Sequence, residues 1–466
     1  MEYEPNEQAH QSVTKFEAML KTDAVYFFDA EDFEEIIHHY LNEGKLSLAK
    51  KAIQMGLQQH PGSIELKLLD VEVMVFENQF EKAETLLDRL QQIDPQNEEI
   101  FIQRANICSK QNNHLKAIDL LYQALALTED DFDIHSLLGM EYLFLDDYQR
   151  AKMCFIHCLD IEPEDYTSLY NLIFCFEYLE DNQGAITYLN NYLDSNPYCQ
   201  VAWHQLGKQY YEAKMYPEAL SAFDYAIISD DTFLGAYYEK GRVLEQLKQY
   251  TEAIENYSLT MELDNPTSQA YLRMGRCYEK LGAYEQAQHY YYLTVHEDPL
   301  LDKGWLAITD FYIGQKKFNK AKEYIDKAIN IDGENATYWK RCAIIHSTLG
   351  DLDESDFAFS QAVDLGDYEL DTWLSWSKVL CTNDELEAAV EVLLQGLEFH
   401  PEKAALKYAL AGMYHKLGQE PQAYDQLKSA IQLEPENLKE FRQGYPEFYS
   451  TPSVQRIIKE SQKASE

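Results

Sequence analysis

Short runs of apolar residues, spaced three and four positions apart, alternate with polar breaks along this chain. Between residues 203 and 231, two such runs flank a polar break at 214–217. Steps of three and four residues place side chains on one face of an α-helix. The pattern predicts two short amphipathic helices joined by a tight turn, and neither helix can bury its apolar face alone. The positions that define it are Trp203, Leu206, Gly207, Tyr210, Ala219, Phe223, Ala226 and the turn residue Asp231.

The same pattern returns every 34 residues. Prolines mark the turns in pairs one period apart, at Pro61 and Pro95, Pro163 and Pro197, and Pro401 and Pro435. Other turn residues hold the same place at Glu129, Asp231, Asn265, Gly333 and Asp367. A period of this length is typical of a solenoid, in which stacked neighbours bury the faces that one unit leaves open. Within a unit, small residues such as Gly207 are expected where two backbones approach, with large ones such as Phe223 beside them.

These positions resemble the signature of the tetratricopeptide repeat, which is Trp, Leu-Gly, Tyr, Ala, Phe, Ala and Pro at this spacing. Further units match it at Leu138, Gly139, Tyr142, Ala151, Phe155 and Pro163; at Tyr271, Met274, Gly275, Tyr278, Gly282, Ala287, Tyr291 and Pro299; and at Trp305, Tyr312, Ala321 and Ala328. The resemblance implies an all-α fold, a right-handed superhelical α-solenoid of tandem helix-turn-helix repeats, in a bacterial-type cytoplasmic scaffold. We expect an amino-terminal segment with a capping helix at 1–29, twelve units at 30–437, and a capping helix and tail at 438–466, as one continuous domain.

A few units depart from the pattern. Asp70 and Arg104 stand one period apart where Leu206 stands in the sixth unit, and Ser355 replaces the first alanine of the tenth. Asp70 and Arg104 would therefore occupy equivalent places on adjacent repeats. They either pair across the repeat interface and fix its register, or each reaches water from a half-buried position.

The charge of the chain limits its partners. Acidic residues outnumber basic ones by 80 to 39, for a formal net charge of −41. Phosphate binding depends on clustered Lys and Arg, so neither nucleic acid nor an anionic membrane is the expected partner. No apolar run approaches the roughly twenty residues that span a bilayer, and the polar start at 1–12 lacks the order of a secretory signal. The expected location is the cytoplasm.

Tetratricopeptide arrays bind partners in a concave groove lined by the first helix of each unit, so the resemblance allows groove residues to be assigned by phase. In units six to twelve these positions are rich in basic residues, whereas in units one to five they hold only Lys110. We therefore predict a basic stripe in an acidic protein, with a loose carboxylate site as one use of it. The predicted basic groove residues are Lys208, Arg242, Arg273, Arg276, Lys280, Lys303, Lys340, Arg341 and Lys378, followed by Lys416.

The amino-terminal half of the groove is predicted to be apolar. An apolar trough followed by a basic channel suits a partner peptide, helix or acidic C-terminal tail. Some of these side chains could instead pack between neighbouring first helices, which would remove them from the surface. The predicted apolar groove residues are Phe76, Met140, Phe144, Tyr170, Phe174, Tyr178 and Tyr211.

Motifs for catalysis, cofactors and metals are not found. The chain has no phosphate-binding glycine loop, nucleophile elbow, His-Glu-x-x-His pair or calcium loop. Cys154, His157 and Cys158 share one predicted helix, but no second ligand pair supports a metal site. Six cysteines occupy helix-packing places, where cysteine behaves as a small apolar residue; they are Cys108, Cys154, Cys158, Cys175, Cys277 and Cys342. The prediction is a protein that is not an enzyme and has no cofactor or metal.

The two ends carry apolar stripes that are expected to cap the array, because a terminal repeat has a neighbour on one side only. They are Phe16, Met19 and Leu20 with the run Val25 to Phe28 at the start, and Leu438, Phe441, Tyr445, Phe448, Val454, Ile457 and Ile458 at the end. Alternatively, the amino-terminal segment occupies the apolar trough and competes with partners.

Three function classes follow from these observations. The first is a scaffold or adaptor that binds another protein in its groove. The second is an RNA-binding helical repeat that uses the basic stripe, although the apolar groove positions lack the paired polar selectors of such arrays. The third is a regulatory subunit of an enzyme complex.

Overall fold

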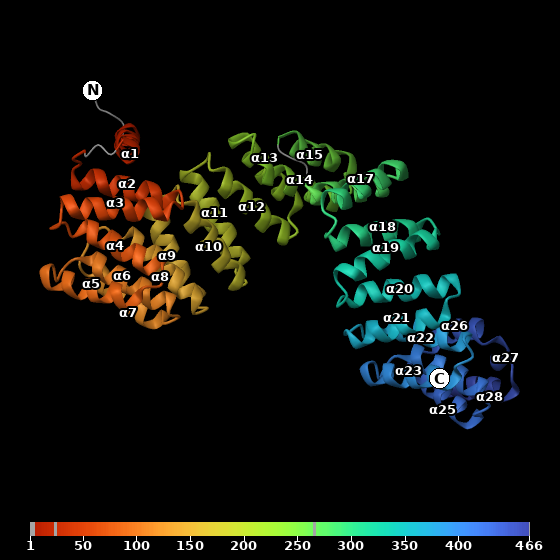
Figure 1. Cartoon of the computed structure of the whole chain (residues 1–466). Helices are drawn as coiled ribbons and strands as arrows, with labels where there is room; N and C mark the ends of the chain where they lie inside the picture. The colour runs from red at the N-terminus through yellow and green to blue at the C-terminus, as the bar shows by residue number, and fades with distance from the viewer. Residues whose placement is uncertain (1–4, 23–25, 264–266, 466) are drawn as a thin grey trace. The chain divides into compact units, whose positions relative to one another are not determined.

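The computed structural model describes residues 5–22, 26–263 and 267–465, which form helices joined by short turns (Figure 1). Val25 and Asn265, named above, lie outside these residues. None of the described helices combines the length and apolarity needed to cross a bilayer. The backbone groups into two compact units, Met1–Asp231 and Thr232–Glu466.

The first unit contains α1 to α13. Their bounds are Pro5–Thr22, Ala30–Asn42, Leu46–Gln59, Glu65–Phe76, Phe80–Ile93, Glu98–Lys110, His114–Leu125, Phe132–Phe144, Tyr148–Ile161, Tyr166–Tyr178, Asn182–Ser195, Gln200–Glu212 and Tyr216–Ser229. The second unit contains α14 to α28 with a short 3₁₀ turn, η1. Their bounds are Leu234–Gln246, Tyr250–Leu263, Ser268–Lys280, Tyr284–Glu297, Asp302–Gly314, Phe318–Ile331, Ala336–Leu349, Leu352–Asp364, Leu370–Thr382, Leu386–Phe399, Ala404–Lys416, Glu420–Leu433, Pro435–Asn437 (η1), Leu438–Gly444, Pro446–Tyr449 and Pro452–Ser465.

From α2 to α25 the helices form pairs, and each pair has the same turn. At the end of α12, the amide of Met215 donates to the carbonyl of Tyr210, and Lys214 between the helices has a φ of 60°. This is the left-handed conformation that ends a helix in a Schellman motif. A residue with positive φ recurs at this place every 34 positions, at Gly44, Asn78, Asn112, Asp146, Glu180, Lys214, Lys248, Gly282, Lys316, Gly350, Asp384 and Gly418. The period in the sequence is therefore a period in the backbone.

Small and large residues meet within the pairs as the sequence predicted. A Cβ atom on Gly207 would lie 2.6 Å from the ring of Phe223, so only glycine fits beside this phenylalanine. The same contact recurs between Gly139 and Phe155, Gly241 and Tyr257, and Gly275 and Tyr291. The predicted packing of glycine against an aromatic ring is confirmed.

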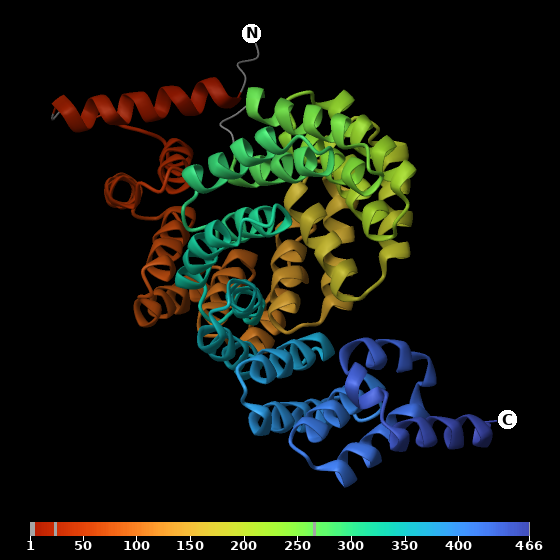
Figure 2. The same cartoon turned by 90° about the vertical axis from the view of Figure 1, so that its right-hand side faces the viewer.

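At the start of the first unit, α1 packs on α2 (Figure 2). Phe16 and Met19 are buried there with Phe28, as expected of a cap, whereas Phe27 is exposed. The edge-to-face contact between Phe16 and Phe33 joins α1 to the first pair. These contacts place α1 on the end of the array, which supports capping over occupation of the groove.

At the end of the second unit, α26 to α28 follow the last pair, and α28 packs on α25. Phe441, Phe448 and Val454 are buried in one cluster with residues of α24 and α25. Tyr445 lies so close to Gly412 that no side chain could replace that glycine without displacing the ring. The predicted carboxy-terminal capping residues thus pack against the last pair.

The six cysteines named above are all buried free thiols. Burial raises the pKa of Cys154 and of Cys277 to about 12, which keeps both thiols protonated at neutral pH. They pack as small apolar residues, as predicted.

Candidate functional site

Several first helices of neighbouring pairs pack against each other within each unit. In the first unit, α2 contacts α4, and α4 contacts α6. A hollow of about 430 Å³ opens on these three helices. We call it the amino-terminal hollow; it is lined by Leu41, Asn42, Gly44, Leu46, Glu72, Val73, Val75, Phe76, Gln103, Asn106, Ser109 and Lys110.

Phe76, predicted as a groove residue, projects from the last turn of α4 into this hollow. Its side chain is 65% exposed, although the neighbouring Val73 and Val75 are buried. The Lys110 ammonium group, from α6, lies 5.3 Å from the centroid of the Phe76 ring, within the range of a cation–π contact. An exposed ring held at the edge of an apolar floor is the kind of group that anchors a partner side chain.

A second hollow of about 310 Å³ adjoins the first and is strongly acidic. Glu72 and Gln103 line both, so the two hollows are adjacent. We call it the acidic hollow; it is lined by Glu34, His38, Glu65, Leu68, Leu69, Glu72, Asn97, Glu98, Glu99 and Gln103.

Gln103 has an unusual hydrogen-bonding state. Its side chain is only 5% exposed, and its Nε2 donates to Oε1 of Glu99 at 2.7 Å. Its own Oε1 has no hydrogen-bond partner within the described residues. An unsatisfied buried acceptor costs about 1–3 kcal/mol, so a donor from a bound segment would stabilise this site once the Gln103 side chain turns its buried oxygen toward the hollow.

The carboxylates beside Gln103 favour the same kind of ligand. Partial burial raises the pKa of Glu99, and Gln103 and Glu72 modify it in opposite directions. Partial burial also raises the pKa of Glu72 and of Glu34. Carboxylates crowded in this way bind a cationic donor well, because the positive charge stabilises their ionised forms.

The assignment of groove residues from the sequence did not include Glu72 and Gln103, although both stand at groove positions of the repeat. Glu72 stands one period before Asn106 and two before Met140, which was predicted as a groove residue. Gln103 stands five periods before Arg273, another predicted groove residue. The groove assignment considered only basic and apolar residues, so it omitted Glu72 and Gln103.

Other predicted apolar residues lie further along the first unit. Phe144 is 58% exposed and stacks on His114 with ring centroids 4.9 Å apart. Phe174 and Tyr178 are exposed and cluster with Tyr148, so part of each ring contacts protein.

The remaining three members of this set differ in exposure. Tyr170 is exposed, whereas Met140 is partly buried against the core and its sulfur accepts a hydrogen bond from Asn171. Tyr211 is half-buried beside Tyr216. Both outcomes foreseen for these side chains, exposure and packing between helices, therefore occur.

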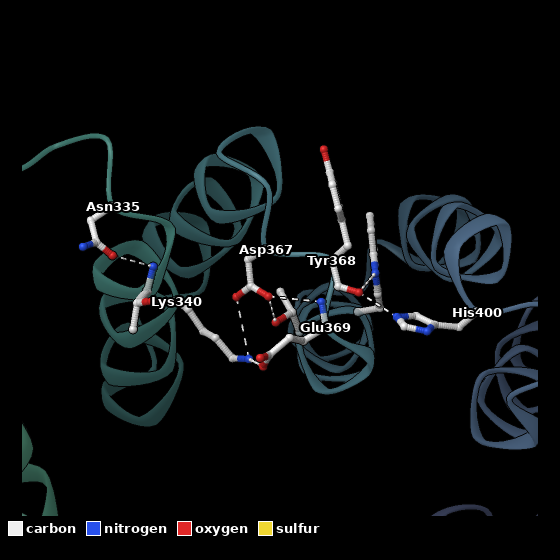
Figure 3. Close-up of polar contacts among 9 residues, drawn as sticks. Asn335, Lys340, Asp367, Tyr368, Glu369 and His400 are labelled. Atoms are coloured by element: carbon white, nitrogen blue, oxygen red, sulfur yellow. Dashed lines mark hydrogen bonds and ion pairs between the residues drawn. The ribbon is translucent and has the colours of Figure 1, made fainter. Parts of the chain in front are cut away.

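The predicted basic stripe is interrupted by ion pairs. Lys340 is only 9% exposed, and its ammonium group lies 2.6 Å from Glu369 and 3.7 Å from Asp367 of the next repeat (Figure 3). Asp367 in turn accepts hydrogen bonds from the amide of Glu369 and the hydroxyl of Thr372. Lys340 thus joins two repeats and does not present its charge in an open groove.

Three further predicted basic residues are also paired, by acids that the phase assignment did not consider. The pairs are Arg242 with Glu239 at 2.7 Å, Arg273 with Glu245 at 3.3 Å, and Arg341 with Asp310 at 2.9 Å. The expectation of a continuous basic channel is therefore revised to isolated basic positions.

Six predicted basic residues have no ion pair within the described residues; one of them, Lys416, donates a hydrogen bond to the sulfur of Cys381. Arg276 and Lys280 line a hollow of about 330 Å³ in the second unit, the carboxy-terminal hollow, with Glu245, Glu279 and Asp310 among its other residues. Lys303 and Lys378 are exposed, and Lys208 is half-buried.

The pair between Asp70 and Arg104, one of the two alternatives drawn from the sequence, does not form. Arg104 directs its guanidinium group to Glu84 at 3.3 Å, Asp88 at 2.6 Å and Gln91 at 2.7 Å, all on α5. Burial raises the pKa of Asp70, and Lys50 opposes this effect. Arg104 therefore pairs with acids on the second helix of the preceding pair and not with the equivalent position on the first helix.

Comparison with known families agrees with this geometry. Residues 204–261, including the unit from which the pattern was read, match the family model of the tetratricopeptide repeat. Together with the pairing of helices and the 34-residue period of the backbone, this match decides the family. The chain is a tetratricopeptide repeat protein.

Two longer matches cover most of this tetratricopeptide repeat protein. Residues 234–443 match the C-terminal domain of cilia and flagella-associated protein 70, and residues 49–220 match the ChAPs family, the Chs5p-Arf1p-binding proteins. No curated protein matches the chain significantly.

Solved tetratricopeptide repeat proteins are similar at low identity. A protein from Parabacteroides merdae is 16% identical, with a TM-score of 0.43 over 54% of this chain and 99% of its own. The C-terminal part of a protein from Cytophaga hutchinsonii is also 16% identical, with a TM-score of 0.45 over 52% of this chain and 98% of its own. Tetratricopeptide repeats generally mediate protein–protein interactions and are generally non-catalytic.

Proposed function

We propose that this tetratricopeptide repeat protein is a scaffold that acts by binding alone and holds a segment of another protein on its first-helix face. The observation that carries the proposal is the junction of the amino-terminal and acidic hollows. There an exposed aromatic ring, a buried unsatisfied acceptor and a group of carboxylates lie on three successive first helices.

The proposed partner segment carries an apolar side chain followed closely by Lys or Arg. The apolar side chain contacts Phe76 and the valines of α4. The ammonium or guanidinium group donates to Oε1 of Gln103 and pairs with Glu72 and Glu99. An acidic segment fits this end of the face poorly, because it would meet the carboxylates of the acidic hollow.

The family comparisons support a protein partner. The ChAPs family, whose model matches residues 49–220, is named for binding two other proteins. The RNA-binding alternative receives less support, because ion pairs occupy four of the ten predicted basic positions and carboxylates line the acidic hollow.

A second candidate site is the carboxy-terminal hollow. Arg276 and Lys280 make no ion pair within the described part of the chain, and Lys303 is exposed on the next first helix. These three basic residues would bind the acidic partner tail that the sequence led us to expect. Charge reversal should use Arg276, Lys280 and Lys303, because reversing Lys340 would break a link between repeats.

Selection from random peptides displayed on phage tests the main proposal and does not require the natural partner to be identified first. The purified protein should enrich peptides that carry an apolar residue near Lys or Arg, and Phe76→Ser should abolish the enrichment. Ile93→Ser is the matched control, because Ile93 is 64% exposed on α5, the second helix of the same pair. Enrichment that survives Phe76→Ser, or that Ile93→Ser removes equally, would overturn the proposal.

A further inference from the structure

A group of metal-ligating side chains lies on α8 and α9, apart from the hollows described above. Asp131 precedes α8, His135 is on its first turn, and His157 is on α9. One ligand atom from each of the three lies within 4.8 Å of the others, and within the described residues no other group of three or more meets this condition. His157 Nε2 is 3.0 Å from a carboxylate oxygen of Asp131, and the two imidazole rings have centroids 4.0 Å apart.

The repeat shows that these residues depart from what the fold requires. His135 and His157 stand two periods before Trp203 and Tyr225, whose rings stack with centroids 4.7 Å apart. Three periods after Trp203 and Tyr225 the same two places hold Trp305 and Lys327, and the ammonium group of Lys327 lies over the indole ring. Two other repeats therefore pack at these two positions without any metal-ligating pair. The fourth pair of helices has two imidazoles there instead.

Asp131 shares its repeat position with residues that cap their helices and with others, such as Asn97, that do not. It occupies the N-cap of α8, but its side chain accepts no hydrogen bond from the helix. One period later, Asp165 accepts from the amides of Thr167 and Ser168, and further on Thr267 and Asn335 also cap their helices. An N-cap hydrogen bond stabilises a helix. Asp131 forgoes it and turns its carboxylate to the histidines.

The hydrogen bonds also fix which nitrogen of one imidazole is free to coordinate. His135 Nδ1 lies 3.0 Å from the carbonyl oxygen of Asp131. A carbonyl only accepts, so Nδ1 carries the proton and Nε2 carries the lone pair in the neutral ring. A metal-binding histidine is typically oriented in this way by a carbonyl at its other nitrogen.

The site is open to solvent on one side. The side chains of His135, His157 and Asp131 are 19%, 40% and 27% exposed. A hollow of about 320 Å³ adjoins the histidines and leaves space for further ligands such as water.

We propose that Asp131, His135 and His157 bind a divalent transition metal of the zinc type. Two imidazoles and a carboxylate suit zinc, and three protein ligands leave a position for water or another donor. The inference does not depend on the groove proposal, because none of the three residues lines the groove hollows.

Calorimetric titration of the chelator-treated protein with Zn²⁺ tests it. Excess Mg²⁺ is kept present to occupy exposed carboxylates, which it prefers over imidazole. One Zn²⁺ per chain should bind. The double variant His135→Trp and His157→Tyr, which restores the pair found at Trp203 and Tyr225, should fold and lose this site.

Two aspartate variants separate coordination from helix capping. Asp131→Asn should weaken Zn²⁺ binding about tenfold or more, whereas Asp165→Asn, at the same repeat position, should leave it unchanged. Absence of Zn²⁺ binding, full binding by the double histidine variant, or equal loss in Asp131→Asn and Asp165→Asn would each overturn the proposal.

Discussion

Gly207 lies so close to Phe223 that a Cβ atom on the glycine would be 2.6 Å from the phenylalanine ring. Equivalent positions one or more periods away vary in size, and Ala343 stands opposite Phe359. Where the first residue is Ala105 or Ala411, the second is Leu121 or Leu427. In the pair of Gly207 and Phe223, the glycine and the ring share one volume between the two helices.

This relationship predicts that the two positions are energetically coupled. Gly207→Ala gains up to about 1 kcal/mol of helix propensity, but overpacking against Phe223 costs about 1–3 kcal/mol. We expect a net loss of stability. Adding Phe223→Leu should recover part of it, with a coupling free energy on the order of 1 kcal/mol. Urea unfolding of the wild type, both single variants and the double variant measures the coupling, and strictly additive effects would contradict the shared volume.

The pKa shifts in the acidic hollow predict a pH-dependent stability. Partial burial raises the pKa of Glu72 and Glu99 above the usual 4.5, so ionising them in the folded protein costs free energy. This cost is absent below pH 4.5 and develops as the pH rises through the raised pKa values. The double variant Glu72→Gln and Glu99→Gln should therefore be more stable than the wild type at neutral pH, by on the order of 1 kcal/mol or less because both residues retain solvent contact.

Thermal unfolding measured against pH checks this, and the difference should vanish below pH 4.5. The control is the double variant Asp119→Asn and Glu255→Gln, which removes two exposed carboxylates and an equal amount of charge. The prediction fails if this control shows the same gain, since general repulsion in a chain of charge −41 would then explain it.

The ion pairs of Lys340 predict a structural role for that residue. Lys340→Met leaves Asp367, whose side chain is 8% exposed, without its cation. We expect a loss of about 1–3 kcal/mol in the free energy of unfolding, because the carboxylate stays buried with less compensation. Lys303→Met, at an exposed position, should change stability by less than about 0.5 kcal/mol. Chemical unfolding of the two variants compares them, and equal stability would contradict the link between repeats.

The fold could be predicted well from the sequence, because each position in the repeat limits the size and polarity of the residue that fits there. Packing at Gly207 and Phe223, and burial of the cap residues Phe16 and Phe441, depend on residue size and phase alone. Each repeat solves the same packing problem, so one unit predicts the others.

The site was predicted less completely because its electrostatics depend on neighbouring helices. Arg273 and Arg341 were assigned to the groove together with the exposed Lys303 and Lys378, yet Glu245 and Asp310 on the preceding first helices reach them. Arg104 likewise pairs with α5 and not with Asp70. The position of a residue within the repeat determines the face on which it lies. The residue with which it forms an ion pair depends on side-chain conformations across the interface between repeats.

The most direct test of the proposed function is a double-mutant cycle between the protein and a peptide selected on it. Affinities are measured by fluorescence for the selected peptide and its Lys-to-Gln or Arg-to-Gln analogue, against the wild type and the double variant Glu72→Gln and Glu99→Gln. If the acidic hollow binds the basic residue, each change alone should weaken binding about tenfold or more, and both together should cost little more than one. Additive losses, or full affinity of the double variant for the basic peptide, would contradict the proposal.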